Sequence, residues 1–428
     1  MLTTEKRKAI RILMQQEIVP AIGCTEPISV ALCTAGACRV LEKKAERIDA
    51  FLSGNVIKNA MGVGIPGTGM IGLPIAIALG ALKGHPEDGL ELLKEITEED
   101  VEQGKQFIRE ERIRIHPCPE NSEKLYIEIR CSAGDQTSNA IIRGDHTHFT
   151  YIGLNGKALL DEQVILPTDA DTGQHAPLTF RTIYEYATES PVKELNFILK
   201  AARMNRKVAE EALVKQYGHN VAGSLQRRKG REIFGDNLHS RMLIATAGAC
   251  DVRMDGAMIP VMSNSGSGNQ GIAATVPVMT FAEQEGCPEE TMVRALTLSS
   301  LLIIYIKQHL GKLSALCGCV VASTGSACGI TFLMGGNYQQ IIFAAKNMIA
   351  NITGMICDGA KPGCALKIAS GVSTATLSAV MAMENEGVSA KEGIIDEDID
   401  QTIRNLALIG NRGMQETDRL VLEIMTKK

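Results

Sequence analysis

Five of the twelve cysteines fall within one stretch of the chain, residues 313–370. They are Cys317, Cys319, Cys328, Cys357 and Cys364. The last two bracket a turn-rich loop, DGAKPG, and a helical segment separates them from the first three. Thiols that converge from such segments can hold a metal ion or an iron–sulfur cluster, because these clusters are bound mainly by cysteine thiolates. The spacing matches neither paired CxxC motifs nor the ferredoxin run, so packing as buried core cysteines is the alternative interpretation.

Another cysteine, Cys24, stands where a helix is expected to begin. It lies in the segment IGCTEP, whose Pro27 suits the first turn of a helix because the missing N–H would have no partner there. The helix dipole and the free N–H groups at that end favour an anion and lower the pKa of a thiol. Cys24 is therefore a candidate reactive thiol. Cys33 and Cys38 lie among alanine and leucine and are interpreted as core residues.

A glycine-rich loop, NAMGVGIPGTG, follows the next expected strand. Gly62, Gly64 and Gly67 satisfy the pattern G-x-G-x-x-G, which marks a dinucleotide site only between a strand and a helix with an acidic residue about 20 positions later. Pro66 interrupts the pattern, and the acidic residues at 87–88 belong to a turn. We therefore expect a loop in which the backbone closely approaches a ligand or another helix.

A second loop of small residues, MSNSGSGNQG, occupies residues 262–271 and opens into an apolar helix. It is dense in hydroxyl and amide groups. Such a loop at a helix N-terminus can hold a carboxylate or phosphate through its N–H and hydroxyl groups. A ligand-binding loop is favoured over a flexible one, because long loops of this composition are uncommon inside compact domains.

The whole-chain composition narrows the class of protein. The net charge is -5 and no basic stripe occurs, which argues against a nucleic-acid partner. The N-terminus predicts an amphipathic helix without the apolar core of a signal peptide. The longest apolar runs fall short of the ~20 residues of a membrane span. We expect a cytoplasmic protein without a membrane partner, whose cysteines stay reduced.

The predicted fold is α+β. Alternating polar and apolar residues after about residue 111 predict three or four antiparallel strands. The remainder is helical. The expected architecture is a mainly α-helical catalytic domain, residues 1–104 and 166–428, with a smaller inserted α+β lobe at residues 105–165. The apolar small-residue helices would suit a homodimer.

Four motifs taken together are similar to one family. They are residues 23–27 (GCTEP), 263–271 (SNSGSGNQG), 325–328 (GSAC) and 357–364 (CDGAKPGC). The set resembles the L-cysteine desulfidases, which are related to the alpha chain of the iron–sulfur L-serine dehydratases. The resemblance runs over nearly the whole chain. It is looser toward the serine dehydratases proper, whose ligand loop is longer and whose N-terminal serine/histidine motif appears here as GCTEP.

The resemblance implies a 4Fe–4S cluster held by three cysteines, with one iron left open. Cys357 and Cys364 match the paired ligands. Cys317 is favoured over Cys319 as the third ligand, and Cys328 matches a structural position. Pyridoxal phosphate is not expected, since no pattern marks a Schiff-base lysine.

The implied reaction is an α,β-elimination that converts L-cysteine to pyruvate, ammonia and hydrogen sulfide. The open iron acts as a Lewis acid, and soft thiolate suits it. Cys24 resembles an active-site cysteine of the family, either the base that removes the α-proton or a cluster ligand displaced by substrate. The resemblance implies a small-molecule amino acid substrate that contacts the GCTEP motif, the glycine-rich loop and the serine-rich loop. The expected substrate-binding residues are Thr25, Glu26, Thr68, Ser263, Asn264, Ser265, Gly266 and Ser267.

Two other functions stay open. An L-serine dehydratase would use the same chemistry on a hydroxyl leaving group. A non-catalytic protein that binds zinc or a cluster would contain metal and release no pyruvate from any amino acid.

Overall fold

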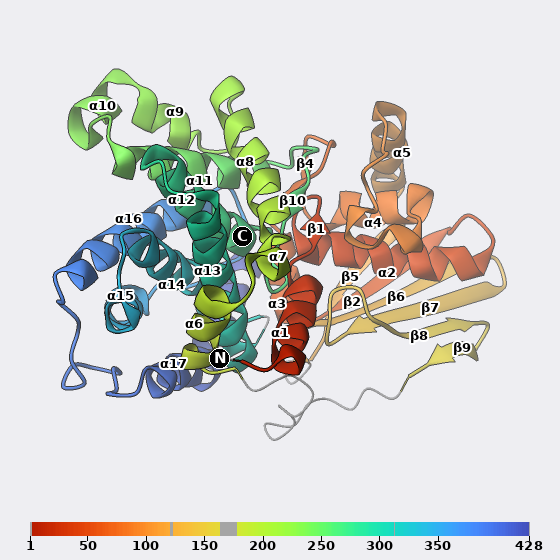
Figure 1. The fold of residues 1–428 in the computed structure, drawn as a ribbon. Helices are drawn as coiled ribbons and strands as arrows, with labels where there is room; N and C mark the ends of the chain where they lie inside the picture. The colour runs from red at the N-terminus through yellow and green to blue at the C-terminus, as the bar shows by residue number, and fades with distance from the viewer. Residues whose placement is uncertain (1, 120–122, 163–177, 312, 428) are drawn as a thin grey trace.

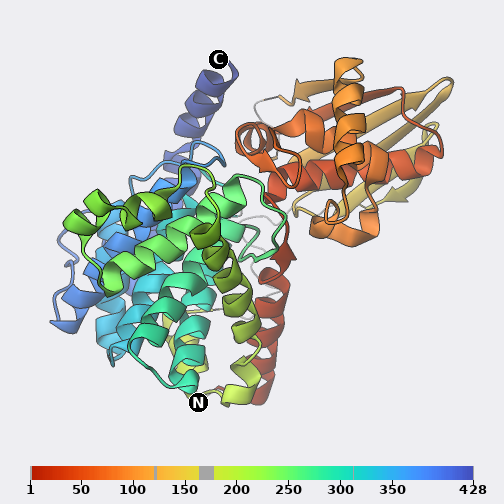
Figure 2. The same ribbon diagram turned by 90° about the horizontal axis from the view of Figure 1, so that it is seen from above.

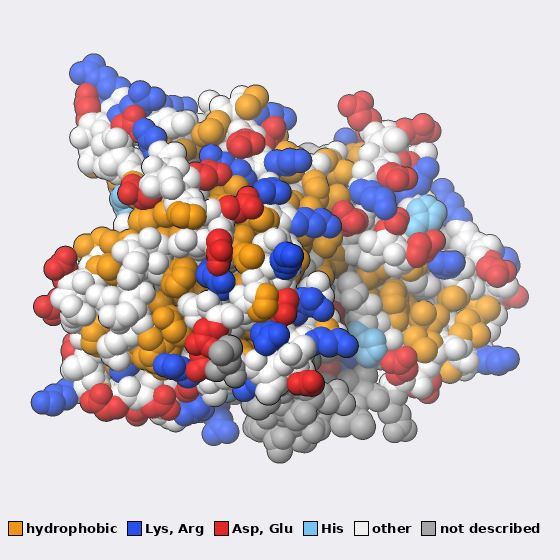
Figure 3. Space-filling view, viewed as in Figure 1, with side chains coloured by type: hydrophobic (Ala, Val, Ile, Leu, Met, Phe, Trp, Pro, Cys, Tyr) orange, Lys and Arg blue, Asp and Glu red, His pale blue; other side chains and the backbone are white. Residues whose placement is uncertain are grey.

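The computed structural model describes residues 2–119, 123–162, 178–311 and 313–427. Figures 1 and 2 show a large helical body beside a lobe that is built on a β-sheet. The predicted α+β fold, mainly helical with a smaller sheet-containing lobe, is confirmed. On the face drawn in Figure 3, basic and acidic side chains are interspersed.

The lobe contains a six-stranded mixed sheet in the order β5-β2-β6-β7-β8-β9. Its strands are β2 (Arg47–Leu52), β5 (Ile113–Pro117), β6 (Tyr126–Ala133), β7 (Gln136–Arg143), β8 (Phe149–Leu154) and β9 (Lys157–Asp161). β2 pairs in parallel with β5 and antiparallel with β6, and the later strands follow one another as antiparallel neighbours. Alternate residues of β7 are buried, as the polar–apolar pattern predicts.

Segments from outside residues 105–165 also contribute to the sheet and its packing, and the predicted domain boundaries stay a prediction. β2 supplies an inner strand of the sheet, and α2 (Thr25–Leu41) packs on the sheet. α4 (Leu73–Lys83) packs on α2, and α5 (Glu98–Arg109) packs on α4 (Figure 2). β2 pairs in parallel with β5, and α4 and α5 lie between these two strands in the sequence, so the alternating segment alone could not reveal this pairing.

The helical body is centred on α14, which packs against α12, α13, α15 and α16. Its helices are α1 (Thr4–Glu17), α6 (Phe180–Glu189), α7 (Val192–Leu195), α8 (Ile198–Val214), α9 (Val221–Gln226), α10 (Arg228–Phe234), α11 (Leu238–Met254), α12 (Gly268–Gln284), α13 (Glu289–Leu310), α14 (Gly318–Leu333), α15 (Tyr338–Ile352), α16 (Cys364–Met383), α17 (Ile399–Leu408) and α18 (Gln415–Thr426). Small residues allow close approach in this core. A Cβ on Gly325 of α14, for example, would overlap the carbonyl oxygen of Ser299 on α13.

The remaining elements are short. They are β1 (Pro20–Ala21), α3 (Gly54–Ala60), β3 (Gly64–Ile65), β4 (Met70–Ile71), the 3₁₀ helix at Pro86–Glu91, β10 (Val261–Met262) and the π-helical turn at Ile409–Gly413. β1 and β10 form one two-stranded sheet, and β3 and β4 form another.

Among the described residues, α16 is the one helix long and apolar enough to cross a membrane by length and composition. Ile368, Val372 and Ala375 on this helix are fully buried, and it packs against α11, α14 and α15. These contacts are those of a core helix. Leu366 and Leu377 are exposed on its outer side. That the protein forms a homodimer stays a prediction.

Gly80 tests the packing of α4 on α2. A Cβ there would overlap the main-chain carbonyl of Ala31. We expect Gly80→Ala to lower the free energy of unfolding by about 1–3 kcal/mol, although alanine favours a helix interior over glycine by ~1 kcal/mol. Urea unfolding of the protein measures this change. Gly354→Ala is the control, because no neighbouring atom lies within 4 Å of its Cβ position. Equal stability of the two variants would contradict the close packing.

Candidate active site

Two of the motifs meet through the β1–β10 pair, in which Ala21 lies opposite Val261. The first motif follows β1 and the serine-rich loop follows β10. Thr25 joins them, because its hydroxyl donates a hydrogen bond to the main-chain oxygen of Gly266 at 2.7 Å. The start of α2 and the serine-rich loop therefore form one site, although they lie about 240 residues apart in the sequence.

Cys24 occupies the N-cap position of α2, as predicted, and is buried. Its thiol donates to Glu26 Oε2 at 3.2 Å, and Asn59 of α3 donates to Glu26 Oε1 at 2.9 Å. Burial, and then the charge of Glu26, raise the pKa of the Cys24 thiol far above its usual value, while Arg253 acts in the opposite direction. The predicted lowering of this pKa is therefore wrong. That Cys24 takes part in catalysis stays a prediction.

Three side chains of the serine-rich loop maintain the shape of the loop. Ser263 and Asn264 donate to main-chain carbonyls outside it, at 2.7 and 3.0 Å, and Ser265 donates to Asn264 Oδ1 at 2.9 Å. Ser265 and Gly266 have left-handed backbone conformations, with φ of 49° and 78°. These hydrogen bonds hold the shape of the loop, and substrate binding by Ser263, Asn264 and Ser265 stays a prediction.

The N-terminus of α12 can bind an anion. Ser267 is its N-cap, and the Ser267 side chain makes no capping hydrogen bond. The first three N–H groups of an α-helix have no partner within the helix, so they can bind an anion. Gln270 is buried, and its Oε1 atom has no hydrogen-bond partner among the described residues. Its side chain packs against Gly318, the residue after Cys317.

Thr68 has a local function. Its hydroxyl donates to the carbonyl of Ile65 at 2.8 Å and accepts from the N–H of Met70 at 2.9 Å, so it stabilises the turn between β3 and β4. The close backbone approach predicted for the glycine-rich loop is confirmed at Gly64, where a Cβ would lie 2.5 Å from the main-chain carbon of Asp255. The partner is the connection between α11 and β10.

Cys317 and Cys357 lie on two extended segments that pair beside each other. An isolated antiparallel bridge joins Leu316 to Ile356. The N–H of Cys317 donates to the carbonyl of Met355 at 2.9 Å, and that of Cys357 donates across the bridge at 2.7 Å. Cys317 is then the N-cap of α14. The pairing brings together two cysteines that the sequence separates by a helix.

Cys364, the first residue of α16, completes the group. Burial raises the pKa of its thiol to about 11, and negative charge on Cys317 and Cys357 acts in the same direction. Burial is also the main cause that raises the pKa of the Cys357 thiol. The positive charge of Lys58 lowers this pKa, and negative charge on Cys317 raises it. Each of these thiols is therefore within electrostatic range of the other two. The three cysteines therefore lie in one region of the structure, and their part as cluster ligands stays a prediction.

The donor set fits an iron–sulfur cluster chemically. The described residues contain no group of three or more His, Cys, Asp or Glu side chains placed to hold a single metal ion. Lys58 donates to the Cys357 carbonyl at 3.5 Å and Lys367 to the Ile356 carbonyl at 2.6 Å. Each lysine also pairs with an acid, Lys58 with Asp418 and Lys367 with Asp358. Both lysines still lower the pKa of the Cys357 thiol.

The choice of the third ligand rests on the position of Cys317. The side chain of Cys319 lies outside the described residues, so the preference for Cys317 over Cys319 stays a prediction. Cys328 is buried inside α14, and its thiol donates to the carbonyl of Ile341 at 3.6 Å, which suits the structural part predicted for it.

Sequence reasoning missed two residues of α11. Cys250 is fully buried, and burial followed by charge on Cys364 raises the pKa of its thiol. Arg253 is three residues further along α11, and its charge acts on both Cys24 and Cys250. The sequence did contain one indication of these residues. Cys250 and Arg253 are three positions apart on a helix that precedes the serine-rich loop, so they lie on the same face of that helix.

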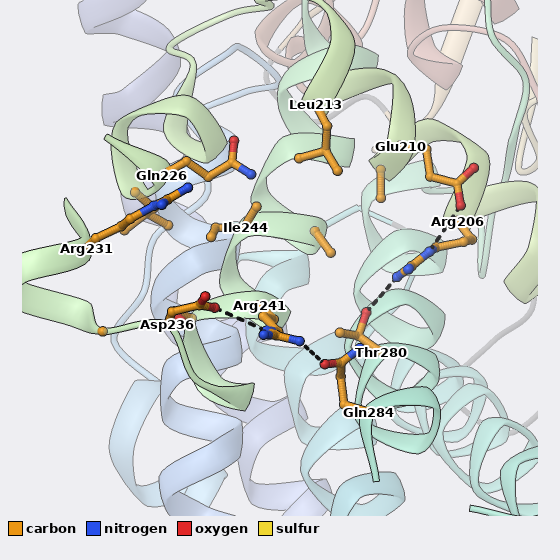
Figure 4. A pocket seen from close by; sticks show the side chains of 15 residues that line it. Arg206, Glu210, Leu213, Gln226, Arg231, Asp236, Arg241, Ile244, Thr280 and Gln284 are labelled. Atoms are coloured by element: carbon orange, nitrogen blue, oxygen red, sulfur yellow. Dashed lines mark hydrogen bonds and ion pairs between the residues drawn. The ribbon is translucent and has the colours of Figure 1, made fainter. Parts of the chain in front are cut away.

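A pocket of about 320 Å³ lies elsewhere, among α8, α9, α10, α11 and α12 (Figure 4). None of the predicted site residues lines it. Arg206 pairs there with Glu210 and contacts Thr280, and Arg241 pairs with Asp236 (Figure 4). Most of its charges are thus balanced locally, and it is separate from the cysteine-containing site.

Comparisons with known proteins agree with this arrangement. A family model described as the serine dehydratase alpha chain matches residues 87–423. A UPF0597 protein of Bacteroides fragilis is 57% identical to this chain, over 100% of both chains. A UPF0597 protein of Bacteroides thetaiotaomicron is also 57% identical, over 99% of this chain and 98% of its own. A UPF0597 protein of Oleidesulfovibrio alaskensis is 42% identical over 97% of both chains.

The helical body that gathers these cysteines is thus a domain of the serine dehydratase alpha-chain class. The chain belongs to the serine dehydratase alpha chain family, and it shares nearly its full length with the UPF0597 proteins. The matched region contains the cysteine and serine-rich motifs, whereas the motif around Cys24 precedes it.

Proposed function

We propose that this protein is a lyase that catalyses α,β-elimination from a β-substituted amino acid, with L-cysteine as substrate. L-Cysteine and one water give pyruvate, ammonia and hydrogen sulfide. The observation that carries the proposal is that Cys317, Cys357 and Cys364 lie in one region. Helix α3 connects this region to the Cys24–Glu26 pair. On this helix, Asn59 donates to Glu26 and Lys58 donates to the carbonyl of Cys357.

The family resemblance implies that Cys317, Cys357 and Cys364 would hold a 4Fe–4S cluster. When bound, a cluster with one open iron supplies a Lewis acid that binds the substrate and stabilises the departing sulfur. The two lysines beside Cys357 would favour the thiolate form of the ligands, because nearby positive charge stabilises a negative one.

The Cys24–Glu26 pair is suited to move the α-proton. The Cys24 thiol is protonated and donates to Glu26, so it cannot act as a base until Glu26 takes its proton. We assign the two residues as a unit. The Sγ atom accepts the proton from Cα as its own proton passes to Glu26 Oε2. The electron pair of the broken C–H bond forms the Cα=Cβ bond, and the sulfur leaves with the electrons of the C–S bond.

The aminoacrylate product requires no further residue. It rearranges to the imine, and water hydrolyses the imine to pyruvate and ammonia. The proton on Glu26 can pass to the departing sulfide, which returns the pair to its starting state. Burial of both side chains keeps bulk water from these proton transfers.

The match to the serine dehydratase family model supports a second candidate, L-serine, whose hydroxyl would leave in the same way. The two substrates differ by one atom at the leaving group. A soft thiolate binds iron better than a hydroxyl does, which favours cysteine. The third possibility, a protein that binds metal without turnover, leaves the Cys24–Glu26 pair unexplained.

Steady-state kinetics of anaerobically reconstituted protein distinguish these functions. We expect a higher kcat/KM for L-cysteine than for L-serine, with pyruvate and sulfide released in equal amounts. A preference for serine would overturn the substrate assignment and keep the elimination. Metal-loaded protein that forms pyruvate from neither amino acid would overturn the lyase assignment.

A further inference from the structure

Arg253 is a buried cation whose Nε and Nη2 atoms have no hydrogen-bond partner within the described residues. The residue lies in the last turn of α11 and is only 4% exposed. Both nitrogens are buried, and Arg253 forms no ion pair in the part of the chain that the structure describes. The nearby acid Asp251 instead accepts the main-chain N–H groups of His219 and Val221. An arginine stays protonated in a protein, and a buried unpaired charge is costly, so an anion is expected to fill this place.

The guanidinium lies directly against the start of α12. A Cβ on Gly268, the first residue of that helix, would overlap Arg253 Nε. Glycine at this position allows the guanidinium to approach the free N–H groups of the helix. Both kinds of donor therefore lie beside Gly268. A carboxylate has two oxygens, and the planar guanidinium fork matches such a group in a bidentate manner.

A buried carboxylate lies close by. Glu26 is 7% exposed, and its oxygens accept from Cys24 and Asn59 without a cationic partner in the described structure. Thr25, next to Glu26 in the sequence, donates to the main-chain oxygen of Gly266, two residues before Gly268, which places Glu26 in the same site as Arg253. The charge of Glu26 raises the pKa of the Cys24 thiol, and that of Arg253 lowers it. The two unpaired charges of opposite sign beside one thiol match the carboxylate and ammonium groups of a zwitterionic α-amino acid.

We infer that Arg253 and the N-terminus of α12 form the carboxylate-binding site for an α-amino acid, and that Glu26 faces its ammonium group. This inference rests on the proposed function, since it places the α-carbon of the substrate beside Cys24. It makes Arg253 a specificity residue for the free α-carboxylate. Amino-acid amides, and residues whose carboxyl group forms a peptide bond, lack that group and are excluded.

Binding measurements test the site without turnover. L-Alanine carries the carboxylate, the ammonium and a β-carbon with no leaving group, and L-alaninamide lacks only the carboxylate charge. We expect L-alanine, and not L-alaninamide, to raise the melting temperature of the full-length protein. In Arg253→Gln this rise should disappear, whereas Arg241→Gln, a paired arginine on the same helix, should keep it.

Kinetics give a second readout on the same variants. Arg253→Gln should raise the KM for L-cysteine by about 10- to 150-fold, the range expected for losing hydrogen bonds to a charged group, and leave kcat within a few-fold. Arg253→Lys should fall in between, since it keeps the charge and loses the fork. Without ligand, Arg253→Gln should melt no lower than the original protein, because it removes an unpaired buried charge.

A second variant guards against a folding defect. Gly268→Ala keeps the arginine and forces the guanidinium away, so it should lose the L-alanine effect in the same way. Retention of the L-alanine effect in Arg253→Gln, or an equal effect of L-alaninamide on the original protein, would overturn the inference. If L-alanine raises the melting temperature of the original protein but that protein shows no elimination activity, the proposed function alone is contradicted.

Discussion

Replacing Cys357 with alanine is expected to remove the cluster and the turnover together. Its thiol is one of three that lie within electrostatic range of one another, and a cubic cluster left with two protein ligands would be lost. Cys364→Ala should behave in the same way. Iron content and visible absorption after anaerobic reconstitution measure the first effect, and pyruvate release from L-cysteine measures the second.

Cys328→Ala is the matched control for these variants. This cysteine belongs to the same stretch and is fully buried, but its thiol bonds to a main-chain carbonyl. We expect it to keep iron and turnover. A Cys357→Ala protein that retained full colour and activity would disprove the ligand assignment. Comparison of Cys317→Ala with Cys319→Ala identifies the third ligand.

Glu26→Gln and Cys24→Ala are expected to keep the cluster and lose turnover. General acid–base groups contribute about 10²- to 10⁴-fold to a rate, so kcat should fall by that factor in each variant. The physical reason is the contact between Cys24 and Glu26, through which the α-proton would pass. The measurement is kcat under anaerobic conditions together with iron content.

Cys33→Ala is the control on the same helix. Its thiol is buried and lies 3.3 Å from the carbonyl of Ala140 inside the lobe, away from the site. It should keep both colour and turnover. Full turnover of Cys24→Ala would remove Cys24 from the mechanism. Loss of iron in Cys24→Ala would instead make it a cluster ligand that substrate displaces.

The sequence was most informative where function depends on local structure. Pro27 indicated the start of a helix, and Cys24 lies at the predicted N-cap. The alternating segment predicted the strands, and the serine-rich loop leads into a helix as expected. These features follow from backbone geometry over a few residues, which residue types largely determine.

Features that depend on distant contacts could not be predicted in this way. The position of Cys24 at a helix N-terminus indicated a lowered pKa, but burial by the rest of the chain and the Glu26 charge have the larger effect. The parallel pairing of β2 with β5 brings residues 47–52 into the sheet, which the sequence could not predict, because strand alternation does not specify a partner strand. Cys317 and Cys357 meet through one bridge between segments 40 residues apart in the sequence.

Arg253 shows the same limit most clearly. In sequence it is a cation in the last turn of a helix, where it would complement the helix dipole. Within the described residues, Nε and Nη2 of Arg253 have no hydrogen-bond partner, and this depends on the folded positions of Asp251 and Glu26. The hydroxyl groups of Ser263 and Thr68 illustrate the converse, because they looked available for substrate and are bonded within the protein.

The most direct test of the central claim is a single anaerobic sample in which iron, sulfide and pyruvate are all counted. The protein is reconstituted with iron and sulfide, and L-cysteine is then added. We expect about four irons and four sulfides per chain before substrate, and equal amounts of pyruvate and newly released sulfide afterwards. Iron-free, colourless protein after reconstitution, or loaded protein that yields no pyruvate, would contradict the account.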